Sequence, residues 1–192
     1  MKIVISSSNE GKVREIKEIL GDKYEVLSKK ELGFGQVDVE ETGTTLRENA
    51  YFKAKFLFDK TGENSLADDT GLFIDALNGE PGIYAARYAG EHCNFEDNMN
   101  KVLRNMKGIP FENRTATFKT SLCLIRQDGS VEYYDGECKG RILEKMRGNK
   151  GFGYDPIFLP EGYDISMGEM DEDLKNKISH RRNAFRKLGE NL

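Results

Sequence analysis

Apolar runs typical of buried strands alternate along the chain with segments whose apolar residues recur at helical spacing. This alternation predicts an α/β or α+β fold. The sharpest local signal is Gln127-Asp128-Gly129, which separates two stretches of strand periodicity and predicts a β-hairpin. A bend at Thr70-Gly71 is expected to divide two other strands. The predicted strands are residues 2–7, 24–28, 66–69, 72–76, 115–126 and 131–140. The predicted helices are the segment from Asn9 to Gly21 and residues 45–60, 95–106, 171–177 and 179–188.

The helix predicted at residues 45–60 carries one residue that does not fit its inward face. A long acidic loop, residues 29–44, is expected before this helix. Lys53 projects beside Leu46, at the edge of the apolar face. It either extends along the surface to reach water or points inward, and in the second case it needs an anionic partner. The inward positions are Leu46, Ala50, Ala54, Leu57 and Phe58.

The composition limits the classes of protein that the chain can represent. A chain of 192 residues predicts one domain, or two lobes that share a core. Cys93, Cys123 and Cys138 are odd in number and lack CxxC spacing, which argues against a disulfide framework and favours a reducing compartment. Because the chain has only two histidines, we expect any catalytic metal to be held by oxygen ligands.

Charge and hydropathy narrow the expected partners. A net charge of −4 disfavours a broad nucleic-acid-binding surface, although local lysines can still bind a small anion. No apolar run approaches the length of a membrane span, and no basic segment precedes an apolar stretch at the start. We therefore predict a cytoplasmic protein that binds neither nucleic acid nor membrane.

The first strand ends in small polar residues, and a helix pattern follows at once. A helix N-terminus offers unpaired N–H groups and a partial positive charge. Gly11 would let the backbone approach a ligand and Lys12 would add a full charge, so the segment can form a phosphate site. In the alternative interpretation, Asn9 only caps the helix and Lys12 is solvated. The pattern GxxxxGK[ST] is absent, which disfavours a P-loop kinase or ATPase.

Two separate segments offer carboxylates. Asp68 and Asp69 end an apolar strand, and alternation predicts that one faces a site while the other caps a turn or pairs elsewhere. The alternative is a simple Asx-turn before Gly71. Glu40-Glu41-Thr42-Gly43 is either a solvated acidic loop or a second source of oxygen ligands. Two carboxylate segments in a chain poor in histidine are compatible with Mg²⁺, which binds few carboxylates together with waters and phosphate oxygens.

The C-terminal part adds an aromatic segment and a basic cluster. Phe152-Gly153-Tyr154-Asp155 can stack on a base and read its edge, or it can be a core aromatic in a tight loop. Lys175, His180 and Arg181 can contact an anionic ligand, whereas Ser179 is also a possible cap of the last helix. Together with the opening segment, these features indicate a nucleoside triphosphate site.

The same motifs resemble those of the inosine triphosphate pyrophosphatase family, and they occur in the order seen there. The resemblance extends over essentially the whole chain. The matching motifs are Ser-x-Asn-x-x-Lys at residues 7–12, EETG, ENAYFKA, ADDTGL, PGIYAARYAG, FGYDPIF and ISHR.

The resemblance implies a fold and an activity. It implies an elongated mixed sheet flanked by helices, with two lobes and a cleft between them, as one triphosphate pyrophosphatase domain over residues 1–192. It also implies a homodimer and Mg²⁺-dependent hydrolysis of ITP, dITP and XTP to the monophosphate and pyrophosphate, which cleanses the nucleotide pool.

The resemblance also assigns roles to individual residues. Glu40 and Asp69 match metal ligands, and Asp69 matches the proposed general base. At that step either Asp69 itself or acidification by the metal ion activates the water. Ser8 departs from the family pattern, in which glycine is common at this position. The residues that match substrate contacts are Ser7, Ser8, Asn9, Glu10, Gly11, Lys12, Lys53, Thr70, Phe152, Gly153, Tyr154, Asp155, Lys175, His180 and Arg181.

Two other functions remain open at this point. A related septum-inhibition type of pyrophosphatase prefers modified pyrimidines, and the FGYD and ISHR segments argue against it. A nucleotide-binding module without activity is the second alternative. The presence of both Glu40 and Asp69 argues against it, because binding a triphosphate does not require a base.

Overall fold

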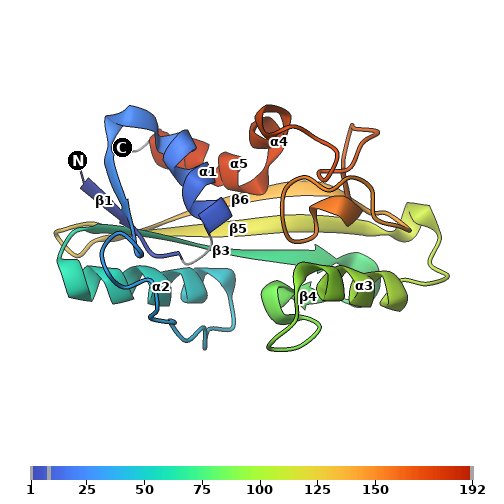
Figure 1. The fold of residues 1–192 in the computed structure, drawn as a ribbon, viewed down its shortest axis with the longest axis horizontal. Coiled ribbons are helices and arrows are strands. Elements are labelled where there is room, and N and C mark those ends of the chain that lie inside the picture. The colour runs from blue at the N-terminus through green and yellow to red at the C-terminus, as the bar shows by residue number, and fades with distance from the viewer. Residues whose placement is uncertain (1, 8–9, 191–192) are drawn as a thin grey trace. The chain divides into compact units, whose positions relative to one another are not determined.

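The computed structural model describes residues 2–7 and 10–190. Its strands are β1 (Lys2–Ile5), β2 (Glu25–Ser28), β3 (Asn64–Ile74), β4 (Pro81–Gly82), β5 (Thr115–Ile125), β6 (Val131–Ile142) and β7 (Phe158–Pro160). Its α-helices are α1 (Glu10–Leu20), α2 (Leu46–Thr61), α3 (Phe95–Asn105), α4 (Glu172–Ile178) and α5 (His180–Gly189), as labelled in Figure 1.

The strands form one mixed sheet in the order β2-β1-β3-β5-β6-β7, and β4 pairs with β3. β1 runs parallel to β2 and β3, whereas β4 is antiparallel to β3 and β7 is antiparallel to β6. This confirms the predicted mixed α/β class. The chain divides into two compact units, and β3, β5 and β6 contribute residues to both. The first unit comprises Met1–Asp69, Thr120–Gly136 and Arg181–Leu192; the second comprises Thr70–Lys119 and Glu137–His180.

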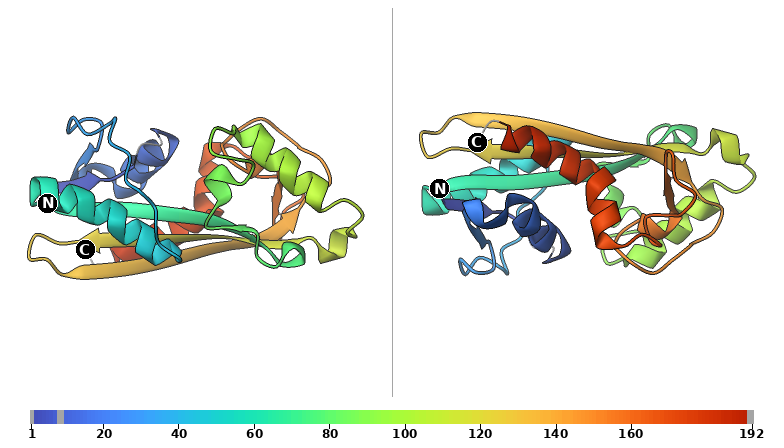
Figure 2. Two further views of the ribbon diagram at one scale, coloured as in Figure 1. Left: turned by 90° about the horizontal axis from the view of Figure 1, so that it is seen from below. Right: turned by 90° about the horizontal axis from the view of Figure 1, so that it is seen from above.

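In the first unit, helices cover both faces of the strands. Leu66 packs with apolar residues of α1 and α5, whereas its neighbour Ala67 packs with residues of α2. Leu122 and Cys123 of β5 divide in the same way, because successive strand residues point to opposite faces. Figure 2 shows α2 in front of the strands from below and α5 in front of them from above. Both faces of β3 are therefore buried in this unit.

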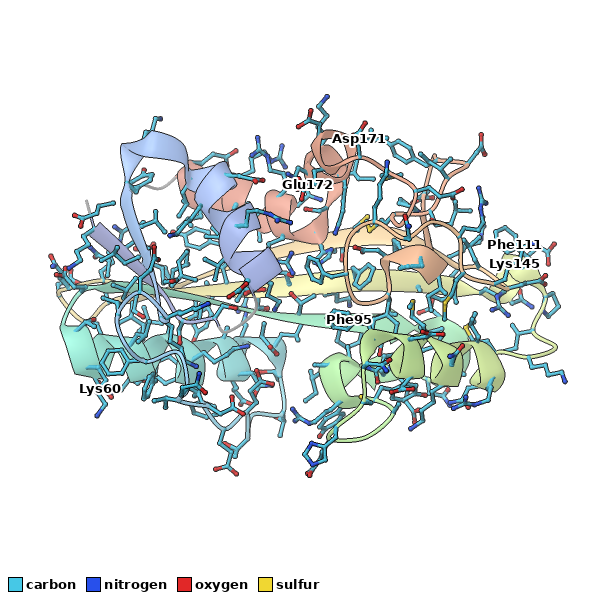
Figure 3. The ribbon with its side chains drawn as sticks, viewed as in Figure 1. Lys60, Phe95, Phe111, Lys145, Asp171 and Glu172 are labelled. Carbon is cyan, nitrogen blue, oxygen red and sulfur yellow. The ribbon has the colours of Figure 1, made fainter. Side chains whose placement is uncertain are left out.

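The second unit has its own apolar core, to which α3 and the segment around β7 contribute. The N-terminus of α3 is fixed by a capping box between Asn94 and Asp97. Asp171 caps α4 by accepting a hydrogen bond from the Leu174 amide at 2.8 Å, and it lies beside Glu172 at the start of that helix (Figure 3). The caps place these helix ends where the sequence predicted them.

Most predicted elements are confirmed to within a few residues. The hairpin closes through the Arg126 amide, which donates to the Ser130 carbonyl at 2.9 Å. Thr45, where the helix was expected to begin, caps α2, and Gly62 ends it with a positive φ of 65°. Residues 29–44 form no helix or strand. Among the described residues, no helix combines the length and apolarity needed to cross a membrane.

One prediction about the sheet is wrong. The expected bend at Thr70-Gly71 is absent, because β3 continues from Asn64 to Ile74. Gly71 serves a close approach instead. A Cβ at this position would lie 2.6 Å from the Gly82 carbonyl oxygen in β4 and 2.8 Å from the ring of Phe73. The alternative of an Asx-turn before Gly71 is excluded as well, because both aspartates lie inside a continuous strand.

We expect Gly71→Ala to lower the free energy of unfolding by about 1–3 kcal/mol, because the added methyl group meets backbone atoms of β4 that cannot move independently. Urea denaturation measures this change. Gly189→Ala is the matched control, since a Cβ there meets no atom within 4 Å. Equal stabilities of the two variants would show that β4 does not pack against Gly71.

Candidate functional site

The burial pattern of β3 determines where its two aspartates point. Asp68 lies on the same face as Leu66, which is covered by α1 and α5. Asp69 lies on the same face as Ala67, which is covered by α2. Both carboxylates are buried, with 2% and 6% of the residue exposed. Each therefore needs cationic or hydrogen-bonding partners from the helices on its own side.

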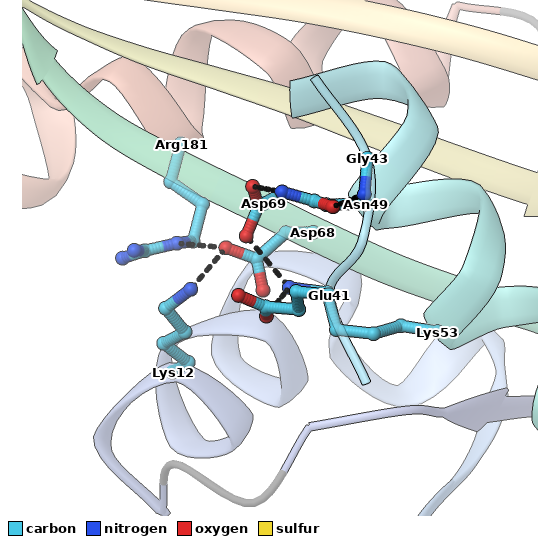
Figure 4. A network of polar contacts seen from close by, with 8 residues as sticks. All are labelled: Lys12, Glu41, Gly43, Asn49, Lys53, Asp68, Asp69 and Arg181. Atoms are coloured by element: carbon cyan, nitrogen blue, oxygen red, sulfur yellow. Dashed lines mark hydrogen bonds and ion pairs between the residues drawn. The ribbon is translucent and has the colours of Figure 1, made fainter. Parts of the chain in front are cut away.

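Asp68 is held by two cations that come from distant parts of the chain. Its Oδ2 atom lies 2.9 Å from Lys12 Nζ in α1 and 3.3 Å from Arg181 Nε in α5 (Figure 4). Burial alone would raise the pKa of Asp68, but Lys12, Arg181 and Lys53 outweigh it and hold the pKa well below its usual range. Burial lowers the pKa of Lys12, and Asp68 only partly offsets this. Asp68 is consequently an ionised, charge-balanced group.

Asp69 has a different environment, formed by α2 and the loop before it. Its Oδ1 atom lies 2.7 Å from Lys53 Nζ, and its Oδ2 atom accepts a hydrogen bond from Asn49 Nδ2 at 3.3 Å. Lys53 also contacts Glu41 Oε1 at 2.9 Å, so its ammonium group lies between two carboxylates (Figure 4). Of the two orientations that the sequence left open for Lys53, the structure shows the inward one, with the anionic partners that it requires.

The pKa values of Asp69 and Lys53 are both raised. Burial raises the pKa of Asp69, although Lys53 and Lys12 act against it and Glu41 adds to it. Burial would lower the pKa of Lys53, but Asp69, Glu41 and Asp68 outweigh it and raise that pKa. Asp69 is therefore a stronger base than an ordinary aspartate, next to a lysine that stays charged.

Two residues of this cluster, Glu41 and Asn49, were not singled out from the sequence. The family resemblance assigned a role to Glu40, which is exposed, whereas it is Glu41 that contacts Lys53. The requirement of an inward lysine for an anion was visible, but nothing in the acidic loop distinguished the two neighbouring glutamates. Asn49 belongs to the ENAYFKA motif, but one asparagine in a helix carries no sequence signal of its contacts.

The predicted phosphate segment is only partly within the described residues. Ser8 and Asn9 lie outside them, and so does the departure of Ser8 from the family pattern. Ser7, Gly11 and Lys12 are half-buried, and α1 begins at Glu10. The Glu10 side chain is exposed and its Oε1 atom lies 2.6 Å from Lys30 Nζ. From this segment, Lys12 reaches the buried cluster through its contact with Asp68.

A second polar set lies in the other unit and centres on Asp155. Asp155 Oδ2 lies 2.6 Å from Lys175 Nζ and accepts a hydrogen bond from the Phe152 amide at 2.8 Å. The Lys175 ammonium group lies 4.5 Å from the centre of the Phe152 ring. Gly151 has a φ of 75°, and a Cβ there would lie 2.1 Å from Asp155 Oδ2. The glycine-rich loop therefore wraps tightly around this carboxylate.

The other predicted residues of this unit differ in their surroundings. The buried His180 ring stacks on Phe118, with ring centres 4.8 Å apart and planes inclined by 16°. Tyr154 lies in the apolar core, and its hydroxyl donates to the Ala85 carbonyl at 2.7 Å. Burial raises the pKa of Tyr154, which fits a structural phenol. Thr70 is half-buried directly after Asp69, and Gly153 adopts a positive φ of 65°.

The carboxylates around Lys53 suit a hard cation. Among residues 2–7 and 10–190, no three or more histidine, cysteine, aspartate or glutamate side chains gather so that they could hold a metal ion. However, the Lys53 ammonium group lies between the carboxylates of Asp69 and Glu41. Carboxylate oxygens therefore already surround a positive charge at this position. Mg²⁺ is bound in many triphosphate sites by one or two carboxylates plus substrate phosphates. The donors present fit such an ion.

Comparisons with known proteins agree over nearly the whole chain. The model of the Ham1 family matches residues 3–191. A dITP/XTP pyrophosphatase of Christiangramia forsetii is 46% identical over 192 residues, covering 100% of this chain and 99% of that protein. A dITP/XTP pyrophosphatase of Bacillus subtilis is 45% identical over 190 residues, covering 98% and 96%.

Solved structures show the same fold. The Ham1 protein of Staphylococcus aureus is 40% identical with a TM-score of 0.88, covering 99% of this chain and 97% of that one. A structure from Mycobacterium abscessus, described as a nucleoside-triphosphatase or dITP/XTP pyrophosphatase, is 35% identical with a TM-score of 0.79, covering 100% and 99%.

Proposed function

This chain belongs to the Ham1 family, and on that premise we propose that it hydrolyses dITP, ITP and XTP to the nucleoside monophosphate and pyrophosphate. It is a hydrolase of nucleoside triphosphates, as the names of its relatives support. The observation that carries the mechanism is Asp69, a buried carboxylate of raised pKa that has a charged lysine 2.7 Å away. Such a group can accept a proton while the neighbouring cation attracts phosphate.

Asp69 would hold a divalent cation, which we propose to be Mg²⁺, together with a glutamate of the acidic loop. The family resemblance assigns this role to Glu40, and Glu41 is the glutamate that lies near Asp69, on the other side of Lys53. When bound, the cation supplies charge neutralisation for the phosphate oxygens. Asp69 would orient the attacking water toward the α-phosphorus and take its proton. Burial raises the pKa of Asp69, although Lys53 and Lys12 act against this, so the carboxylate is a stronger base than an ordinary aspartate.

The cations of the first unit would bind the triphosphate. Lys12 and Lys53 provide two positive charges beside the aspartates, and Arg181 provides a third on the Asp68 side. These charges would stabilise the pyrophosphate as it leaves. Ser7, Ser8, Asn9, Glu10 and Gly11 would complete the phosphate segment at the start of α1, and Thr70 would contact the substrate directly after Asp69.

The polar set of the second unit would recognise the base. We assign stacking to Phe152 and edge contacts to Asp155, His180 and the backbone of residues 152–155, with Lys175 holding Asp155 in place. The Phe152 amide and the Lys175 ammonium group already hold the Asp155 carboxylate. This supports a carboxylate that is oriented before the purine base binds. Tyr154 would act through its backbone, because its side chain lies in the core.

The substrate class suggests where and how the protein works. We propose that it acts in the cytoplasm on free nucleotides, as a homodimer, and so removes non-standard purines from the precursor pool. Neither nucleic acid nor a membrane is expected to be a partner.

The products and the metal requirement test the proposed chemistry. We expect pyrophosphate as the primary product from ITP, because the attack is on the α-phosphorus, and we expect EDTA to abolish turnover and excess Mg²⁺ to restore it. Separate assays for pyrophosphate and orthophosphate, without an added inorganic pyrophosphatase, measure this. Orthophosphate as the first product would contradict the assigned site of attack.

A further inference from the structure

Asn49 is a buried side chain that joins the acidic loop to the catalytic carboxylate. Only 1% of the residue is exposed. Its Oδ1 atom accepts a hydrogen bond from the Gly43 amide at 2.9 Å, and its Nδ2 atom donates to Asp69 Oδ2 at 3.3 Å (Figure 4). One amide group therefore contacts both the end of the Glu40-Glu41-Thr42-Gly43 segment and the proposed base.

The chemistry of the two partners fixes the orientation of this amide. The Gly43 N–H can only donate, so it must face the carbonyl oxygen of Asn49. The amino group then faces Asp69, whose ionised carboxylate can only accept. A Cβ at Gly43 would lie 2.6 Å from Asn49 Oδ1, so the loop approaches as closely as a glycine allows. Both contacts use the amide in the one orientation that satisfies them.

Asn49 and Lys53 act on Asp69 as a pair from the same helix. They are four residues apart in α2 and so lie on the same face. Lys53 contacts Oδ1 of Asp69 and Asn49 contacts Oδ2, so each carboxylate oxygen has its own partner. Two such contacts oppose rotation of the carboxylate, which a single ion pair would permit.

The loop does not need Asn49 in order to join the helix. Glu48 Oε2 already accepts hydrogen bonds from the amide and the hydroxyl of Thr44, at 2.7 and 2.9 Å. The Glu48 amide in turn donates to Thr45 Oγ1 at 3.2 Å. The start of the helix is thus capped without the Asn49 side chain, which adds a contact with Gly43 and a contact with Asp69.

We propose that Asn49 is a positioning residue for the reaction: it sets the direction of the Asp69 carboxylate and fixes the acidic loop relative to it. This inference rests on the proposed function and adds a residue to which that function assigns no role. Polar partners of this kind, one step removed from the reacting atoms, typically change activity by about 10- to 100-fold when they are replaced.

Kinetics of Asn49→Ala and Asn49→Asp test the proposal, each alone and combined with Asp69→Asn. Asn49→Asp keeps the size of the side chain and an acceptor for Gly43, but it replaces the donor to Asp69 with a carboxylate oxygen. Glu48→Gln is the matched control, because it alters the neighbouring cap without touching Asp69. Binding of ITP with a methylene group between the α- and β-phosphorus, measured by calorimetry, separates binding from catalysis. Amide hydrogen exchange at Gly43 reports the loop contact, and thermal melting shows whether each variant is folded.

We expect both Asn49 variants to lower kcat for ITP by about 10- to 100-fold, with analogue affinity within about threefold of wild type. Gly43 should exchange faster in Asn49→Ala and stay protected in Asn49→Asp. In the Asp69→Asn background, neither change should lower kcat further, since a residue that acts through Asp69 has nothing left to position. Glu48→Gln should stay within about threefold of wild type.

Additive losses in the Asp69→Asn background would overturn the proposal, as would wild-type kcat in Asn49→Asp or an equal loss in Glu48→Gln. If Asn49→Ala does not fold, Asn49→Asp decides alone, since it preserves size and the Gly43 contact. Wild-type protein that releases no pyrophosphate from ITP would overturn the proposed function itself. Additive losses in an active enzyme would overturn only the role of Asn49.

Discussion

Asp69→Asn is expected to lower kcat by about 10²-fold or more, because it removes both a metal ligand and the group that accepts the proton from water. The substitution keeps the size of the side chain, and Lys53 keeps its contact with Glu41. We therefore expect the variant to fold. Steady-state release of pyrophosphate from ITP at saturating Mg²⁺ measures the effect.

Asp68→Asn is the matched control, one residue away on the opposite face of β3. It leaves the contacts of Asp69 in place but removes the charge that balances Lys12 and Arg181. Breaking a buried pair of this kind costs about 3–5 kcal/mol, so the main loss should be in the melting temperature. Comparable losses of kcat in the two variants, measured on folded protein, would show that the two faces of β3 do not have separate roles.

The pH dependence of stability separates these roles further. The pKa of Asp68 is lowered by folding, so its contribution is present above the pKa of the unfolded chain, about 3.9, and is lost as the pH falls below that value. The difference in stability between wild type and Asp68→Asn should therefore shrink in acid.

The identity of the purine base of the substrate should have the largest effect of all on kcat/KM. We expect kcat/KM for ITP and XTP to exceed that for ATP by about 10⁴-fold, because a dry site that pairs with a 6-oxo group and an N1–H rejects an edge with the opposite pattern. Asp155 or a backbone carbonyl of residues 152–155 would accept from N1–H. His180 or a backbone N–H would donate to O6. Arg181, which also matches a substrate contact, is paired with Asp68, and we therefore assign it to the phosphates and not to O6.

Guanine gives the sharper test of the same model. GTP shares the 6-oxo group and N1–H with ITP and differs by its 2-amino group, so its rejection requires a pocket that gives this group neither space nor an acceptor. Phe152 cannot make this distinction, because every purine offers a stacking face. Phe152→Leu is thus the matched control and should weaken all purines alike, leaving their ratios unchanged. Equal kcat/KM for GTP and ITP would rule out both edge reading and a role in cleansing the nucleotide pool.

Local sequence signals determined the elements correctly wherever near neighbours decide the backbone. Thr45 and Gly62 bound α2 through contacts within one helical turn, and the turn after Arg126 closes the hairpin in the same way. The period of two along β3 also predicted that its aspartates have separate surroundings. The place of Lys53 at the edge of an apolar face left its orientation open, but it showed that an inward lysine would need an anionic partner.

Tertiary structure alone decided which groups meet. Gly71 looked like a bend because its sequence does not reveal that β4 passes 2.6 Å from where its Cβ would be. Asp68 meets Arg181, 113 residues away, only because α5 packs on the same face of β3 as α1. Glu41 and not Glu40 contacts Lys53, and Asn49 reaches both Gly43 and Asp69, because α2 lies against the other face. The sequence encodes which residues can be buried or charged, but partners far apart in the chain are chosen by the packing of helices on the sheet.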